Sequence, residues 1–287
     1  MPSSDDVRRR FGPPRPAPSA APPPTTATAG TGRADRRRAA GQLADTGITW
    51  DTAALDLSAI HPGPVDRARA RFRASLPDLI WNAARLEGNT YTLPEVRTLL
   101  EGVTVGGKPL SDERQIIALS EGYTALDALV GDGTFSPTKE VSDTLHALIA
   151  RHEAIESGHF RGEGNARGGG AVRLADGGSV DGVDHGTGGA DLIARHATLL
   201  ARLAETPDPR LQALIYFASA ARTQFYVDGN KRTARLVASG ILLREGYDAL
   251  NVPYARRLEF NVALDTLFTT DDATSLMRFL ADCLTLA

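Results

Sequence analysis

The sequence predicts an all-α protein with one small β-hairpin, and two observations carry this prediction. Apolar residues recur at helical spacing in successive segments between residues 65 and 286. One segment breaks the pattern, because residues 162–189 contain eleven glycines and only short pieces such as 171–174 resemble a strand. We therefore expect a helical core with one glycine-rich loop, which is either a mobile active-site flap or a tolerated insertion.

Each segment with apolar residues at helical spacing is predicted to be helical. Pro77 starts or kinks a helix in the first segment, and Gly246 ends the helix that begins near residue 231. The predicted segments are 65–86, 111–130, 138–156, 190–204, 209–222, 231–245, 255–268 and 272–286.

The first 44 residues are predicted to be a disordered tail. They hold eight of the 17 prolines and little apolar mass that could offset chain entropy. They also carry eight arginines against three aspartates, a charge of +5. A basic arm that docks on an acidic partner is the alternative to a solvated tail.

Charge and composition exclude several classes of protein. Because the whole chain has a net charge of −3 and the tail carries +5, the remainder carries −8, which argues against general nucleic-acid binding. The one cysteine, Cys283, excludes an internal disulfide framework and a cysteine-based zinc site. No apolar run is long enough to span a membrane and no signal-peptide core begins the chain, so a cytoplasmic protein is expected.

Two apparent motifs are set aside. Residues 102–108 have the spacing of a phosphate-binding loop, but Pro109 stands where Ser or Thr should hold magnesium. The six histidines include no H-E-x-x-H pattern, and His146 and His152 are six residues apart, off one helical face. The histidines are therefore expected to be core or surface residues rather than metal ligands.

The segment 228–232, D-G-N-K-R, has the features of an anion-binding turn between two helices. Gly229 permits a tight turn, and the following helix points free N–H groups and its positive dipole end at the turn. Lys231, Arg232 and Arg235 place cations where each exposed charge costs about 0.3–1 kcal/mol. A compensating anion, usually phosphate, is expected, although an ordinary charged helix start is the alternative.

Two carboxylates belong to the same hypothesis. Asp228 is the only carboxylate in the turn and could hold Mg²⁺ on bound phosphates. Glu87 ends a predicted helix, where a negative charge faces the negative end of the dipole, so it is a candidate partner for the cluster of arginines at the turn. Such a glutamate can equally be without function.

Three segments resemble motifs of the Fic (filamentation induced by cAMP) family. Residues 223–235, T-Q-F-Y-V-D-G-N-K-R-T-A-R, resemble its signature, H-x-F-x-[DE]-G-N-[GK]-R-x-x-R. Residues 86–96, L-E-G-N-T-Y-T-L-P-E-V, resemble its inhibitory motif, [ST]-x-x-x-E-[GN], and the usual continuation, while residues 158–161, G-H-F-R, resemble the lead into its substrate flap. The resemblance covers roughly residues 65–286 and points to the subclass with an N-terminal inhibitory helix.

The resemblance implies an organisation and an activity. A helical region with the inhibitory motif would span 45–135, and a helical Fic core with a β-hairpin flap would span 136–287. Most members transfer AMP from ATP to a protein hydroxyl with Mg²⁺. Glu87 would pair with Arg235 and block the productive pose of ATP. The implied ligands are Asp228 for Mg²⁺, Gly229, Asn230 and Lys231 for the α- and β-phosphates, Arg232 for the β-phosphate and Arg235 for the γ-phosphate.

Three positions depart from the family pattern. Gln224 replaces the histidine that acts as general base, and a carboxamide has no useful basicity. Tyr226 replaces the phenylalanine, and Ala83 replaces the Ser or Thr that would help hold Glu87. The phosphate half of the motif is thus intact and the proton-transfer half is not.

Two functions follow from these departures. The first is a Fic-type transferase that is weakened, or repurposed to another phosphorylated donor or a small-molecule acceptor, with His159 or His185 of the flap region as a substitute base. The second is a non-catalytic nucleotide-binding module. The expected partners are a nucleotide and a hydroxyl acceptor, with no nucleic acid and no membrane, and a homodimer is one expected assembly.

Overall fold

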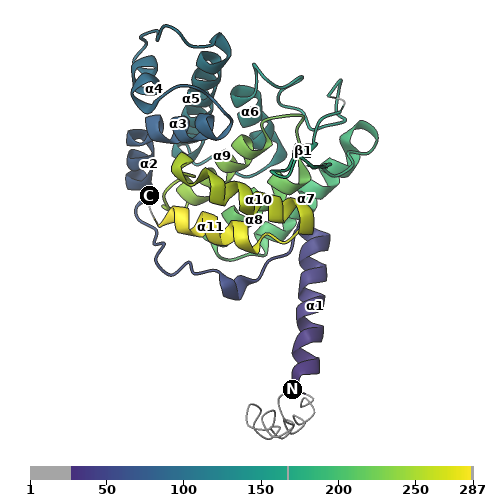
Figure 1. Cartoon of the computed structure of the whole chain (residues 1–287). Helices are drawn as coiled ribbons and strands as arrows, with labels where there is room; N and C mark the ends of the chain where they lie inside the picture. The colour runs from purple at the N-terminus through teal and green to yellow at the C-terminus, as the bar shows by residue number, and fades with distance from the viewer. Residues whose placement is uncertain (1–26, 167, 286–287) are drawn as a thin grey trace, which may run out of the picture. The chain divides into compact units, whose positions relative to one another are not determined.

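The computed structural model describes residues 27–166 and 168–285. By its internal contacts the chain divides into Met1–Arg38 and Ala39–Ala287, and the core and the site described below lie within the second unit. Figure 1 shows its helices and its single hairpin. The α-helices are α1 (Ala27–Thr46), α2 (Val65–Ala74), α3 (Leu76–Leu86), α4 (Leu93–Leu100), α5 (Leu110–Gly131), α6 (Lys139–Ile149), α7 (Ala190–Ala204), α8 (Pro209–Thr223), α9 (Asn230–Leu243), α10 (Arg257–Thr270) and α11 (Thr274–Leu284). The 3₁₀ turns are η1 (Thr52–Ala54), η2 (Thr187–Gly189) and η3 (Tyr254–Arg256).

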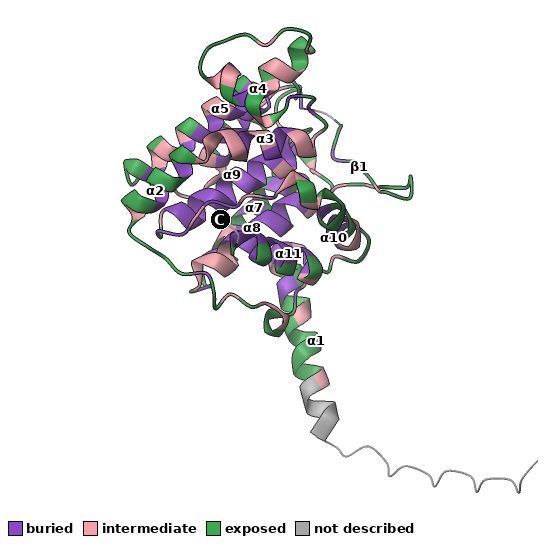
Figure 2. Ribbon diagram, turned by 60° about the vertical axis from the view of Figure 1, so that its left-hand side comes forward, coloured by how far each residue is buried: buried purple, intermediate pink, exposed green. Residues whose placement is uncertain are grey.

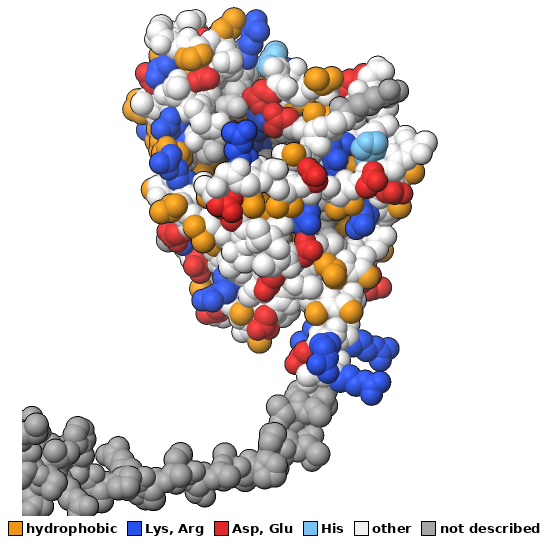
Figure 3. Space-filling view, turned by 45° about the vertical axis from the view of Figure 1, so that its right-hand side comes forward, with side chains coloured by type: hydrophobic (Ala, Val, Ile, Leu, Met, Phe, Trp, Pro, Cys, Tyr) orange, Lys and Arg blue, Asp and Glu red, His pale blue; other side chains and the backbone are white. Residues whose placement is uncertain are grey.

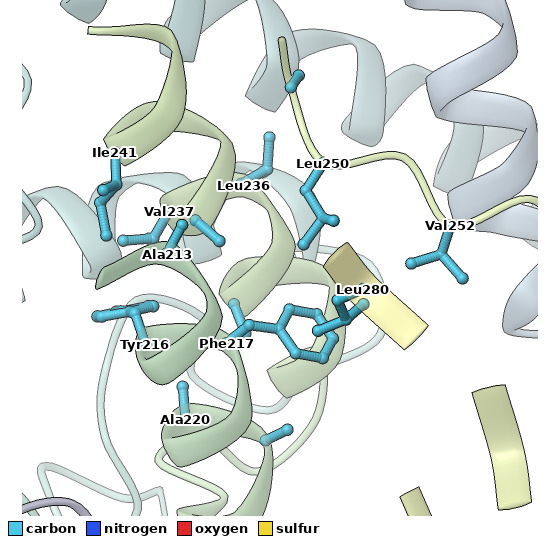
Figure 4. Close-up of a cluster of buried hydrophobic side chains, with 14 of the residues drawn as sticks. Ala213, Tyr216, Phe217, Ala220, Leu236, Val237, Ile241, Leu250, Val252 and Leu280 are labelled. Carbon is cyan, nitrogen blue, oxygen red and sulfur yellow. The ribbon is translucent and has the colours of Figure 1, made fainter. Parts of the chain in front are cut away.

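Helices α8 and α9 pack against each other and form the centre of the core (Figure 2). In α9 only Lys231 escapes full burial, and such an all-round buried surface is typical of an interior helix. Helices α7, α10 and α11 cover α8, and α2, α5 and α6 cover α9. Figure 4 shows part of the packing, with side chains of Ala213, Tyr216, Phe217 and Ala220 from α8, Leu236, Val237 and Ile241 from α9, and Leu250, Val252 and Leu280.

The predicted helical fold class is confirmed, with three local differences. The segment 65–86 forms two helices that part at Ser75, with Pro77 in the first turn of the second. Helix α4 was not predicted, although a capping box of Thr92 and Glu95 begins it. Helix α6 ends at Ile149, so the helix predicted to reach residue 156 is wrong at its end, because the chain turns back to bring the Gly158 N–H to His146.

The predicted disordered tail is corrected in part. Residues 1–26 lie outside the described residues. Residues 27–44 are helical in α1, so the prediction of disorder is wrong there. This stretch is rich in Ala and Arg, which favour helix, and its end is anchored because Ser219 Oγ donates a hydrogen bond to the Thr46 carbonyl at 2.6 Å. The predicted boundary at residue 135 stays a prediction.

The glycine-rich segment contains the predicted hairpin. Strands β1 (Val172–Arg173) and β2 (Ser179–Val180) pair antiparallel, with Val172 opposite Val180. Arg161 holds the base of this flap, since its Nε donates to the Gln224 carbonyl at 2.6 Å and its Nη2 to the Val183 carbonyl at 2.6 Å. The flap is therefore tied to the end of α8.

Among the described residues, every helix is too short or too polar to cross a lipid bilayer.

Candidate functional site

The turn between α8 and α9 is held by two interlocking side-chain amides. Asn230 Oδ1 accepts a hydrogen bond from the Tyr226 N–H at 2.8 Å. Its Nδ2 is therefore the donor, to the Tyr226 carbonyl at 2.8 Å and to Gln224 Oε1 at 2.9 Å. Gln224 Nε2 donates in turn to the Ala221 carbonyl at 2.6 Å. Both ends of the Gln224 carboxamide are thus engaged within the protein.

The imidazole ring of His146 holds the backbone of the turn by a hydrogen bond. Its Nδ1 accepts a hydrogen bond from the Gly158 N–H at 2.8 Å, so the ring proton lies on Nε2 and is donated to the Asp228 carbonyl at 2.9 Å. The ring stacks on Tyr226, with centroids 3.7 Å apart. Burial lowers the pKa of His146 to about 4, so the imidazole is neutral at pH 7. It is a core residue, and it supports the site.

Gly229 is required at the start of α9. Its φ is 73°, and a Cβ at this position would lie 3.1 Å from Ala150 Cβ and 3.3 Å from His146 Nε2. Thr233 is the first residue of α9 whose N–H bonds back to this turn, to the Gly229 carbonyl at 2.9 Å. The N–H groups of the residues between Gly229 and Thr233 have no acceptor within the helix, as at any helix N-terminus, and are available to an anion. The Gly229 N–H is already donated to Asp228 Oδ1 at 2.5 Å.

Glu87 has a different partner from the predicted one. Its Oε1 lies 3.4 Å from Lys231 Nζ. No ion pair joins it to Arg235 within 27–166 and 168–285, so the predicted Glu87–Arg235 pair is wrong for this conformation. The two basic side chains differ in burial. Lys231 lies partly exposed in the first turn of α9, whereas Arg235 lies one turn further along the helix and is 2% exposed.

Arg232 is buried and only partly paired. Its side chain is 3% exposed, its Nη2 pairs with Glu153, and the same nitrogen lies 3.6 Å from Asp228 Oδ1. Burial by itself lowers the pKa of Arg232, but the bond to Glu153 and the nearby carboxylates raise it overall, so the guanidinium stays charged. Its Nε and Nη1 have no hydrogen-bond partner in the part of the chain that the structure describes.

Arg235 is the most unusual group of the site. Its Nε, Nη1 and Nη2 all lack a hydrogen-bond partner among the described residues. Burial raises the pKa of the Tyr123 hydroxyl, whereas the charge of Arg235 and a side-chain hydrogen bond with it lower that pKa. This phenol is therefore the polar neighbour of the guanidinium, although its approach falls short of the strict hydrogen-bond geometry. A buried, unpaired cation is costly, which indicates that an anion completes its surroundings.

Two adjoining pockets meet at the turn. The first has a volume of about 500 Å³ and is lined by residues 171–175 of the flap, 227–232 of the turn, Leu86, Glu87, Gln224, and Asn261, Leu264, Asp265 and Phe268. The second has a volume of about 410 Å³ and lies against the start of α5 and the segment after α6. The pockets share Glu87, Asp228 and Arg232. On the face drawn in Figure 3, basic and acidic side chains lie side by side around a hollow.

The turn fits a magnesium ion that is bound together with phosphates. The Asp228 side chain is 58% exposed and lines both pockets. No group of three or more His, Cys, Asp or Glu side chains able to hold a metal occurs in 27–166 and 168–285. One carboxylate completed by phosphate oxygens and water is an ordinary magnesium environment, so Asp228 suits this role.

The structure brings together the predicted residues other than Arg235, which lines neither pocket at the turn, and adds others. Gln224 and the residues 228–232 share the first pocket, and Glu87 lies at its rim. His185 lines a separate hollow beside Gly162, and its Nδ1 is 2.6 Å from the Gly186 carbonyl, so it is not placed as a base at the turn. His159 lines neither pocket at the turn.

Sequence reasoning missed the contribution of Glu153 and the supporting role of His146. Glu153 stood inside a segment predicted to be helical, and no local pattern marks it. His146 could have been noticed only through its distance in space from Asp228, since 82 residues separate them.

Comparison with known proteins identifies relatives. No protein-family model matches the chain. Among curated proteins it is similar to the "Protein adenylyltransferase Fic" of Drosophila grimshawi, with 26% identity over 230 residues, which cover 79% of this chain and 45% of that protein. The Drosophila melanogaster protein of the same name matches with 26% identity over 79% of this chain and 44% of its own length. The chain spans less than half the length of these relatives.

Solved structures share its fold. A Fic domain containing signaling protein from Bacteroides thetaiotaomicron matches with a TM-score of 0.63 and 21% identity, over 80% of this chain and 89% of that one. Fic-1 from C. elegans matches with a TM-score of 0.61 and 17% identity, over 90% and 71% of the two chains. A Fic family protein from Desulfovibrio desulfuricans has a TM-score of 0.60 and 20% identity, over 94% and 75%.

Proposed function

Since the chain is a member of the Fic domain family, we propose that it is a Fic-type transferase that binds a nucleoside triphosphate with Mg²⁺ at the turn 228–235. The observation that carries the proposal is the pair of buried guanidinium groups, Arg232 and Arg235, with nitrogens that have no partner among the described residues. They lie on a helix whose N-terminus opens into a pocket of about 500 Å³. Each cation at a helix start costs about 0.3–1 kcal/mol, so a bound anion stabilises them.

Each residue of the turn has a defined part in this proposal. The free N–H groups at the start of α9 hold phosphate oxygens, and Lys231 and Arg232 neutralise their charge. Arg235 receives the terminal phosphate. Asp228 would hold the magnesium ion, which, when bound, screens the charge of the phosphates and orients the triphosphate group. The flap strand β1 and α10 form the walls that take the nucleoside.

The reaction is nucleotidyl transfer. An acceptor oxygen forms a bond to the α-phosphorus, the bond to the bridging oxygen of the β-phosphate breaks, and diphosphate leaves. In the named relatives the acceptor belongs to a protein, and we propose the same class here, a protein hydroxyl. Its proton must pass to solvent, because Gln224 has no useful basicity. Positioning and phosphate electrostatics remain, so transfer is slow rather than absent.

A second function is favoured by one observation. Both ends of the Gln224 carboxamide are hydrogen-bonded within the turn, so the position of the base has become part of the scaffold. This favours a non-catalytic nucleotide-binding module. Incubation with labelled ATP separates the two functions: a transferase incorporates label into itself or an acceptor, whereas a binding module shows saturable binding without incorporation.

Calorimetry with ATP and Mg²⁺ tests the shared part of both functions. Replacing Arg232 by Ala should weaken binding by about 1.5–3 kcal/mol, the cost of a lost charged hydrogen bond. Arg151→Ala is a matched control, because Arg151 pairs with Glu121 outside both pockets. The proposal fails if the parent binds no nucleotide or if Arg232→Ala binds as the parent does.

A further inference from the structure

Glu153 forms an ion pair with Arg232, which lines both pockets. It pairs with Arg232 Nη2, and its side chain keeps 24% exposure, whereas Arg232 keeps 3%. It lines the second pocket, as Glu87 and Asp228 also do. A phosphate that approaches Arg232 therefore meets a carboxylate that is already paired with it.

A relay of amides holds Glu153 in place. Asn89, which is buried, donates from Nδ2 to Gln115 Oε1 at 2.8 Å. This fixes the orientation of the Gln115 amide, so its Nε2 is the group that donates to Glu153 Oε1 at 2.8 Å. Asn89 itself is held, since its Oδ1 accepts the Tyr91 N–H at 3.0 Å. The relay leads from the end of α3, just after Glu87, to Arg232.

Glu153 can leave without breaking an element of structure. It lies beyond the end of α6 at Ile149, in the turns that lead to the flap. Among the described residues its side chain makes one ion pair, with Arg232, and one hydrogen bond, from Gln115. Arg232 keeps Nε and Nη1 without a partner among the described residues, so Glu153 satisfies only part of what this cation can bind.

The charges around the turn explain what the pairing does. Lys231, Arg232 and Arg235 are opposed by Glu87, Glu153 and Asp228, so the site is formally neutral when Glu153 is in place. A monophosphate on the N–H groups of α9 need not reach Arg232. A longer phosphate chain does, and there it meets the negative charge of Glu153, which already holds Nη2.

On this basis we propose that Glu153 is a specificity-determining residue, which sets how strongly the site discriminates between phosphate chains of different length. The proposal rests on the proposed function in one respect, namely that the anion at the turn is a phosphate chain. Glu153 lowers the affinity for di- and triphosphates and leaves the affinity for monophosphates unchanged.

Calorimetry on the full chain tests this with inorganic tripolyphosphate, ATP and AMP, the nucleotides with Mg²⁺. Glu153→Gln should raise the affinity for tripolyphosphate and ATP on the order of tenfold, since a charged competitor is removed, and leave AMP unchanged. Glu121→Gln is the matched control, because Glu121 pairs with the neighbouring Arg151 and lines neither pocket at the turn. It should change none of the three affinities.

A second variant protects the test against a folding defect. Gln115→Leu removes the donor to Glu153 and should raise the affinity for ATP in the same direction by a smaller factor, while thermal unfolding reports whether each variant is folded. An equal rise for AMP and ATP, or no rise in either variant, overturns the inference about Glu153. If tripolyphosphate responds as expected and no nucleotide binds to any form, the inference stands and the proposed function fails.

Discussion

The two ends of the turn between α8 and α9 differ in how their polar groups are satisfied. At Gln224, each end of the carboxamide has a partner within the protein, at 2.6 and 2.9 Å. At Arg235, three buried nitrogens have no partner among the described residues. A satisfied polar group stabilises the fold, whereas an unsatisfied buried cation is retained where a ligand completes it. The difference separates the scaffold of the site from its binding surface.

The strongest test of this comparison introduces a base at position 224, where the carboxamide of Gln224 is now hydrogen-bonded at both ends. Gln224→His combined with Glu87→Gly should raise nucleotidyl transfer by 10²–10⁴-fold, the usual contribution of a general base, because a histidine of pKa near 6.5 would face the acceptor. Auto-modification with labelled ATP measures it, with Glu87→Gly alone as the control. If the double variant shows no increase in transfer, then loss of the hydrogen bond from Asn230 to Gln224 outweighs the added base, and the site has diverged by more than a lost base.

A second test concerns the support beneath the turn. The pKa of His146 is lowered by burial to about 4, so the unfolded state binds a proton between about pH 6.5 and 4 and the folded state does not. Stability is therefore full above pH 6.5 and is lost as the pH falls towards 4, by up to about 3 kcal/mol for this group.

Thermal unfolding across this pH range measures the effect. The pKa of His196 is also lowered by burial to about 4, so the parent should show both contributions. His146→Gln should remove the part of the pH dependence that is due to His146 and leave the part due to His196. An unchanged pH profile in this variant would contradict the neutral, buried state of His146.

The smallest expected effect concerns Arg235, whose buried nitrogens lack a partner among the described residues. Arg235→Met replaces an unpaired buried cation by an apolar side chain of similar length, and should raise the free energy of unfolding of the ligand-free protein by about 1–3 kcal/mol. The same variant should bind ATP more weakly. Chemical denaturation and calorimetry measure the two effects. A loss of stability without ligand would show that Arg235 has a partner within the fold.

Part of this molecule could be predicted from local patterns. Helices α7 and α8 were placed within a residue of their bounds, because Ala190–Ala204 follows a glycine-rich stretch and Pro209 marks a helix start. The anion-binding turn was predicted because its glycine and cations break ordinary helix-start preferences. Helix α4 was missed because it has only eight residues, too few for a clear periodicity.

The pairing of charges could not be predicted. Which carboxylate meets Arg232 depends on how α5, the end of α6 and α9 pack, and Glu153 is 79 residues away from it in the chain. Glu87 pairs with Lys231 instead of Arg235 because Arg235 is buried within the core and Lys231 is not. The burial of a side chain along α9 depends on how the helices pack, which local sequence does not reveal.

The anchoring of the flap by Arg161 has a consequence for how this protein can vary. The glycine-rich stretch is closed at its neck, where the Gly182 N–H bonds to the Gly170 carbonyl at 2.8 Å, and Arg161 joins Val183 to the end of α8. Beyond this neck the first strand of the hairpin lines the pocket at the turn, and the Ala175 N–H donates to Asp265 of α10 at 3.2 Å. The tip of the loop that joins β1 and β2 does not line that pocket. Insertions there change the entropy of a closed loop slowly with length, so the tip can lengthen or change composition to meet a new acceptor while the geometry of the phosphate turn is preserved.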